Sequence, residues 1–141
     1  MIKSFRGKVA DGEVHKINLS TNNGLTGYRM VKLFIVGEDP EAETEDFTVK
    51  VFTVEPSSAT AAIDFNDPTL LAMAYLDQNS SSADQPPPLI VFDQMKFNQD
   101  IFITNKSAGG RTANFYIELE QSKLDMNEAT VATLKDMRGR E

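Results

Sequence analysis

The chain has 141 residues, no cysteine and a formal net charge of −7. This length fits one domain of ordinary size, and the lack of cysteine excludes both a disulfide framework and a thiolate metal site or nucleophile. We expect no nucleic-acid contact, because the acidic balance repels phosphate backbones, and no membrane span, because the longest apolar run, residues 70–76, is too short.

The first part of the chain predicts three strands. Residues 2–9 and 15–19 alternate between apolar and polar side chains, and Asp11-Gly12 between them is a hairpin signal, so we expect an N-terminal hairpin. Residues 28–36 form the third strand and carry apolar side chains on both faces, Val31, Leu33 and Ile35 on one and Met30, Phe34 and Val36 on the other. That pattern predicts a strand covered on both sides, or covered on one side by a partner chain.

The middle of the chain predicts a fourth strand over residues 47–54, a short fifth strand over residues 61–65 and then a helix. The helix is expected over residues 69–76, because Asp67 can cap it and Pro68 suits its first turn. Residues 77–88 are low in complexity and end in Pro86, Pro87 and Pro88, which favour a stiff, extended conformation.

The remaining strands are expected over residues 89–97, 101–104 and 111–124. In the last of these the alternation is unbroken from residue 113 to residue 120, which is typical of a strand with one buried face. Many short strands without βαβ alternation predict a mainly β fold: an antiparallel β-sandwich, jelly-roll-like, with one short mid-chain helix and one C-terminal helix. Residues 1–124 would form the β-sandwich domain and residues 125–141 the helix appended to it.

The residues offer little support for catalysis. His15, the only histidine, shares a predicted strand face with Ile17 and Leu19, where a lone histidine is more often packed or hydrogen-bonded than a general base. No serine lies in a G-x-S-x-G turn, and one histidine cannot build a multi-histidine metal site within one chain. We therefore expect neither an enzyme nor a cofactor.

Two acidic clusters could hold a cation. Residues 38–46 carry six carboxylates, which suit calcium, but they lack the order of a known calcium-binding loop. A solvated run of charges is the other interpretation, and the sequence leaves both open. In the second cluster the capping role of Asp67 explains the residues around it without a metal.

A carbohydrate site is a further possibility that the residues leave open. Glu118 and Glu120 share one strand face, as a pair of catalytic carboxylates or a solvated face would. Tyr28, Tyr75 and Tyr116 are candidate stacking platforms for a sugar, although a tyrosine on a strand is more often half-buried packing.

The C-terminal helix is the strongest functional candidate. Asp125 and Glu128 have the spacing of a capping box, and the helix after them carries a narrow apolar stripe, Val131, Leu134 and Met137. The stripe either packs against the chain's own sheets or docks on a neighbouring subunit. We predict an interface that consists of this stripe together with Pro86, Pro87 and Pro88.

Several short motifs carry a family resemblance: NGLTGYRMVK at residues 23–32, YIELE at 116–120, KLDMNE at 123–128 and ATLKDMR at 132–138. In these the chain resembles a group of small virion proteins of marine tailed bacteriophages. The resemblance covers less than half of the chain, contains no catalytic motif, and implies a structural role in the virus particle.

The functional prediction follows from this resemblance and from the missing chemistry. We expect a capsid decoration or cement protein, or a capsid subunit, made in the host cytoplasm and located in the virion. Its partners would be other virion proteins, either the major capsid protein or copies of itself in a homo-oligomer. The alternative is a carbohydrate- or receptor-binding β-module of a phage tail or fibre, which predicts an exposed cluster of Asn22, Asn23, Tyr28 and Asn114.

Overall fold

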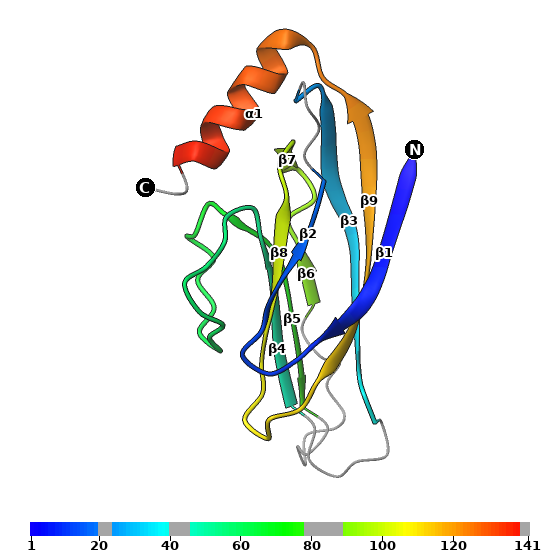
Figure 1. The fold of residues 1–141 in the computed structure, drawn as a ribbon, viewed down its shortest axis with the longest axis vertical. Coiled ribbons are helices and arrows are strands. Elements are labelled where there is room, and N and C mark those ends of the chain that lie inside the picture. Colours follow the sequence, from blue (N-terminus) through cyan, green and yellow to red (C-terminus); the bar gives the residue numbers. More distant parts are fainter. Residues whose placement is uncertain (20–23, 40–45, 78–88, 139–141) are drawn as a thin grey trace.

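The computed structural model describes residues 1–19, 24–39, 46–77 and 89–138, without the side chains of residues 77 and 135–138. These residues form a mainly β structure of two antiparallel sheets and one helix (Figure 1). The elements are β1 (Ile2–Val9), β2 (Val14–Ile17), β3 (Thr26–Gly37), β4 (Asp46–Phe52), β5 (Leu70–Asp77), β6 (Leu89–Val91), β7 (Lys96–Phe97), β8 (Ile101–Lys106), β9 (Ala113–Lys123) and α1 (Met126–Arg138).

The strand pairing is nested along the chain. The four-stranded sheet has the order β1-β9-β3-β7, and the five-stranded sheet has the order β2-β8-β4-β5-β6. Thus β1 pairs with β9, β2 with β8, β3 with β7 and β4 with β5, all antiparallel. The first four strands alternate between the sheets, and β7, β8 and β9 alternate back in reverse order.

The two sheets share one hydrophobic core. The predicted alternation along β9 is confirmed, because Ala113, Phe115, Ile117 and Leu119 are buried and the residues between them are half-buried. These side chains belong to the same buried cluster as residues of β4, β5 and β8 in the other sheet. The inward faces of the two sheets therefore exclude water together.

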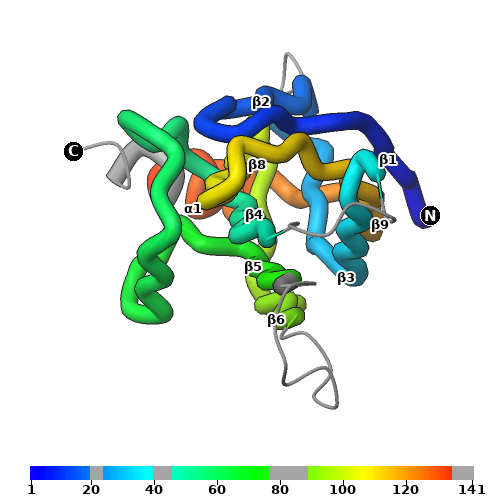
Figure 2. Tube along the Cα trace, turned by 90° about the horizontal axis from the view of Figure 1, so that it is seen from below, coloured from blue at the N-terminus to red at the C-terminus, as the bar shows by residue number. Residues whose placement is uncertain are grey.

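The outer faces of the two sheets differ. The connection between β4 and β5, residues 53–69, lies on the side of the five-stranded sheet that points away from β3 and β9 (Figure 2). Beneath it, the outward-pointing Thr48, Lys50 and Phe52 are buried. On the outer face of the four-stranded sheet, Phe34 and Val36 of β3 remain 51% and 50% exposed. A β-bulge between Met30 and Lys32 changes the predicted faces of β3, so that Met30 lies with Leu33 in the core.

The predicted mid-chain helix is wrong, because residues 70–77 form β5. This strand lies between β4 and β6 and is buried on both faces, so its apolar run lacks the alternation that would distinguish it from a buried helix. Asp67 does not cap a helix. Its Oδ1 accepts hydrogen bonds from the backbone N–H of Thr69 at 2.8 Å and from the Thr69 hydroxyl at 2.7 Å, as in a turn.

The predicted N-terminal hairpin is also wrong, although its turn is present. The N–H of Glu13 donates to the Ala10 carbonyl at 3.0 Å, and Gly12 has a positive φ of 80°. The Gly12 N–H, however, donates to the carbonyl of Asn105 at 2.8 Å. The turn therefore leads the chain from one sheet to the other, and β1 and β2 do not pair.

Two further strand predictions change. Residues 61–65 form no strand and lie exposed in the connection between β4 and β5. The strand expected over residues 89–97 is split into β6 and β7, which belong to different sheets. Between them the N–H of Met95 donates to the Phe92 carbonyl at 3.4 Å, so a turn separates the two strands. The other expected strands and the C-terminal helix are confirmed, with bounds that shift by a few residues.

Candidate functional site

The helix α1 begins at the capping box that the sequence predicted. The N–H of Glu128 donates to Asp125 Oδ1 at 2.7 Å, and the N–H of Asp125 donates to Glu128 Oε1 at 3.4 Å. These reciprocal bonds satisfy two backbone donors at the start of the helix. They also set the direction in which the helix leaves the end of β9 (Figure 1).

A buried asparagine ties α1 to the sheets. The side-chain amide of Asn98, which is fully buried, donates to the Gly24 carbonyl at 3.0 Å, the Ala129 carbonyl at 3.3 Å and the Thr133 hydroxyl at 2.9 Å. Asn98 follows β7 directly, so it links the end of that strand to the first two turns of α1. In the sequence Asn98 falls between the strands expected over residues 89–97 and 101–104, and no local pattern there indicates this role.

Packing at the base of the helix is equally close. The N–H of Leu124 donates to the Leu25 carbonyl at 2.7 Å, and the Leu124 side chain covers Gly27 of β3. A Cβ atom at Gly27 would lie 2.6 Å from Leu124 Cδ2, so only glycine leaves room for this contact. The start of α1 is therefore held in one position against β3.

The helix packs on the sheets through small side chains and leaves larger ones outside. Ala129 and Ala132 are each 7% exposed and form a small buried cluster with Leu124. Val131 and Leu134, two of the three stripe residues, are 52% and 48% exposed. The side chain of Met137 lies outside the described part of the chain. The inward face of α1 therefore packs against its own chain, while Val131 and Leu134 of the apolar stripe stay about half exposed to solvent.

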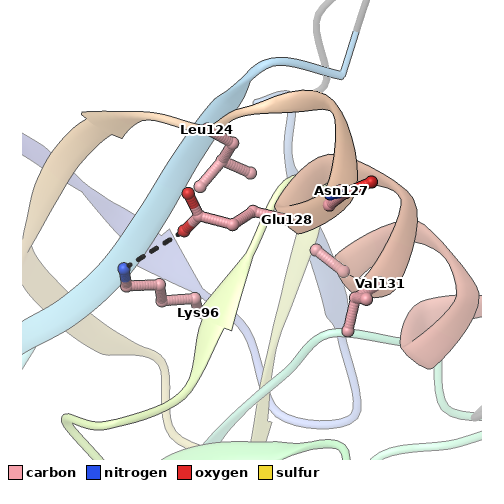
Figure 3. Close-up of a pocket in the computed structure, with 6 residues that line it drawn as sticks. Lys96, Leu124, Asn127, Glu128 and Val131 are labelled. Atoms are coloured by element: carbon pink, nitrogen blue, oxygen red, sulfur yellow. Dashed lines mark ion pairs between the residues drawn. The ribbon is translucent and has the colours of Figure 1, made fainter.

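An apolar groove runs beside this stripe. Its volume is about 310 Å³, and it is lined by Lys96, Leu124, Asn127, Glu128, Val131 and Ala132 (Figure 3). Lys96 Nζ lies 3.8 Å from Glu128 Oε2, so an ion pair links β7 to α1 at one side of the groove. The groove and the exposed stripe share Val131 and together form one surface, which we call the helix surface: the groove with Leu134.

The other residues considered as site candidates make contacts within the sheets, and His15 is packed against an aromatic side chain, as expected for a lone histidine on a strand. His15 points toward Phe115, with ring centroids 5.6 Å apart, and its Nδ1 lies 3.7 Å from Glu13 Oε2. Glu120 pairs with Arg29 at 2.7 Å, and Glu118 accepts a hydrogen bond from the Tyr116 hydroxyl at 3.0 Å. Both carboxylates are therefore engaged within the sheet. The bond from Tyr116 to Glu118 is also the largest cause that raises the pKa of Tyr116.

Only Tyr28 and Asn114 of the exposed cluster predicted for a sugar-binding module lie in the described part of the chain, and these two do not form such a cluster. Tyr28 is 5% exposed and stacks on Phe97, with ring centroids 6.0 Å apart. The Asn114 side chain donates to the Gly37 carbonyl at 3.3 Å, and Asn22 and Asn23 lie outside the described residues. Buried Tyr28 cannot serve as a stacking platform for a ligand.

Pro86, Pro87 and Pro88, and residues 40–45 of the proposed calcium loop, also lie outside the described residues. Among the residues that are described, no group of three or more histidine, aspartate or glutamate side chains is placed to hold a metal ion. In the same part of the chain, α1 does not have the length and apolar character that a membrane-spanning helix requires.

No match was found in any comparison with known proteins. No protein-family model matches the sequence, and neither the curated proteins nor the solved structures give a significant match.

Proposed function

We propose that the chain is a structural protein of a virus particle, a capsid decoration or cement protein or a capsid subunit, which stabilises the particle through contacts of its helix surface. The observation that supports this most is the arrangement of α1. The helix is fixed to the sheets by Asn98 and by alanines, while Val131 and Leu134 point outward. A helix that is held by these contacts and carries half-exposed apolar side chains beside a groove suits a protein–protein contact.

We also infer that the two sheets form a β-sandwich of the jelly-roll type. A jelly roll consists of a long antiparallel ribbon of paired strands wrapped into two sheets. The nested pairs β1–β9, β2–β8, β3–β7 and β4–β5, divided between two sheets, support this topology. Jelly rolls occur in viral capsid domains and also in lectins, so the fold supports a virion role only by analogy.

The partner in this proposal is the major capsid protein or a second copy of the chain. Substituting Val131 by aspartate places a charge in the apolar contact and should weaken binding about tenfold or more. Because Val131 is 52% exposed, the isolated chain should fold normally. Co-sedimentation with purified particles and the mass of the chain in solution measure the two possible contacts.

Val36→Asp is a matched control. Val36 is 50% exposed, close to the value for Val131, but it lies on the outer face of the four-stranded sheet. The proposal predicts that Val131→Asp loses particle attachment or self-association and that Val36→Asp keeps it. The opposite pattern would assign the contact to the sheet, and normal assembly of both variants would remove the support for the proposal.

A further inference from the structure

A second cavity lies on the outer face of the five-stranded sheet. It is enclosed by β4, β5 and the connection between them, residues 53–69. Its volume is about 310 Å³, at the lower end of the range of about 300–1,000 Å³ for small-molecule sites. The floor consists of buried Lys50, Phe52 and Leu70, and the rim consists of exposed residues such as Ser57, Ser58 and Asp64. This cavity shares no lining residue with the helix surface.

We propose that this cavity binds a neutral, polyhydroxylated small molecule, such as a single sugar ring, with Lys50 as a hydrogen-bond donor at its floor. The site differs from the tyrosine and asparagine cluster that the sequence predicted. It also lies outside the proposed assembly function, so either proposal can fail without the other.

Lys50 is the unusual residue of the cavity, because it is only 5% exposed on the central region of the sheet. Lysine is rarely buried to this extent unless it is paired. Its Nζ donates to the Ala62 carbonyl at 2.6 Å and to the Thr60 hydroxyl at 3.0 Å, and it lies 5.5 Å from the centre of the Phe52 ring. An ammonium group has three N–H donors, and two of them are used by these bonds.

A second polar group on the same sheet face has no partner. Thr104 of β8 is the cross-strand neighbour of Lys50 and is 1% exposed. Its hydroxyl has no hydrogen-bond partner among the described residues. Thr104 is not among the residues that line the cavity, so its hydroxyl marks a buried polar environment beside Lys50 and is not a contact of the ligand.

The charges around the cavity select the class of ligand. Among the described residues that line the cavity, Asp64 and Asp67 are acidic and Lys50 alone is basic, so an anion such as phosphate would meet more negative than positive charge. Burial lowers the pKa of the Lys50 ammonium, whereas the negative charge of Asp67 acts in the opposite direction. A free metal cation, in turn, would be repelled by the ammonium group.

Hydroxyl groups fit this mixture of donors and acceptors. Asp64 and Asp67 bring carboxylate acceptors to the lining of the cavity, and the Oδ1 of each is held in place by a local hydrogen bond, from the Asn66 N–H at 2.9 Å and from Thr69. Lys50 can donate to a ligand oxygen, and Phe52 and Leu70 offer apolar surface to the C–H face of a ring. Sugars combine these features.

Binding can be tested on the full chain by saturation-transfer NMR with glucose, galactose, N-acetylglucosamine and glycerol as probes. Backbone amide shifts then locate the site. Asp64→Asn keeps the oxygen that accepts the Asn66 N–H and replaces the other carboxylate oxygen by an amide, so the fold should be retained. We expect at least one probe to bind saturably and Asp64→Asn to weaken it by about fivefold or more.

Asp93→Asn is the matched control, because Asp93 is an exposed carboxylate outside the cavity. It should leave the affinity unchanged, and Lys50→Met should abolish binding if that variant folds. The proposal is overturned if none of the four probes binds saturably, if Asp64→Asn and Asp93→Asn give the same affinity, or if the shifted amides lie outside β4, β5 and their connection.

Discussion

Replacing Asn98 by alanine should detach α1 from the sheets without unfolding them. The amide of Asn98 reaches three acceptors, of which Ala129 and Thr133 belong to the helix and Gly24 to the segment before β3. The substitution removes all three contacts, and Asn98 is not a member of the hydrophobic cluster that the two sheets share, so its effect should be local.

The size of the effect follows from the hydrogen-bond count. The amide has two N–H groups, so the three contacts correspond to about two full hydrogen bonds, each worth about 1 kcal/mol net. The fully buried position adds the desolvation of acceptors that lose their donor. We expect helix docking to weaken by about 2–3 kcal/mol, which raises the open population about 30-fold to 150-fold.

Native-state hydrogen exchange measures this opening residue by residue. In Asn98→Ala, the amides of α1 should exchange faster by the factor above, while the amides of β4 and β8 in the centre of the five-stranded sheet keep their protection. Asn114→Ala is the control: Asn114 makes one bond, to the Gly37 carbonyl at 3.3 Å, and lies far along β9 from α1. It should leave exchange in α1 unchanged.

Two outcomes would refute this reasoning. If α1 exchanges at the native rate in Asn98→Ala, the helix is held by its apolar contacts and the asparagine contributes little. If α1 and the central strands lose protection together, the helix and the sheets unfold as one cooperative unit and the docking energy cannot be separated.

Two further predictions concern packing and ionisation. Gly27→Ala should lower the free energy of unfolding in urea by about 1–3 kcal/mol, because the new methyl group overlaps Leu124. In the double variant with Leu124→Ala, the loss of stability should be smaller than the sum of the two single losses. Strictly additive losses would contradict the overlap. In Glu118→Gln the pKa of Tyr116 should fall toward its ordinary value, since the Glu118 carboxylate is the main cause that raises it. In the parent chain, the stabilisation that comes from this raised pKa is complete at pH values below the ordinary tyrosine pKa. It is lost as the pH rises through the higher pKa of folded Tyr116. An ultraviolet titration of tyrosinate, assigned with Tyr116→Phe, would contradict this if the pKa did not move.

The sequence predictions are confirmed where the structure of a residue depends on contacts with residues close to it in the chain. The alternation of β9 identifies its buried face because the other face meets water, and the spacing of Asp125 and Glu128 identifies the helix cap because both bonds are local. β5 could not be recognised in this way, since the connection of residues 53–69 covers its outer face and removes the alternation.

Long-range partners account for the other misses. The turn at Gly12 was predicted from its residues, but the carbonyl that receives the Gly12 N–H belongs to Asn105, in a different part of the chain. Asn98 looks like an ordinary turn residue because its helix acceptors lie 31 and 35 positions further on. Val131 and Leu134 of the stripe are about half exposed because Ala129 and Ala132 take the inward face of α1, an arrangement that depends on the sheet beneath the helix.

The most direct test of the assembly proposal is an image reconstruction of the virus particle with this chain located in it. The proposal predicts that α1 faces a neighbouring subunit and that Val131 and Leu134, exposed in the isolated chain, are buried in that contact. A particle that lacks the chain, or one in which α1 faces solvent while another surface makes the contact, would contradict it.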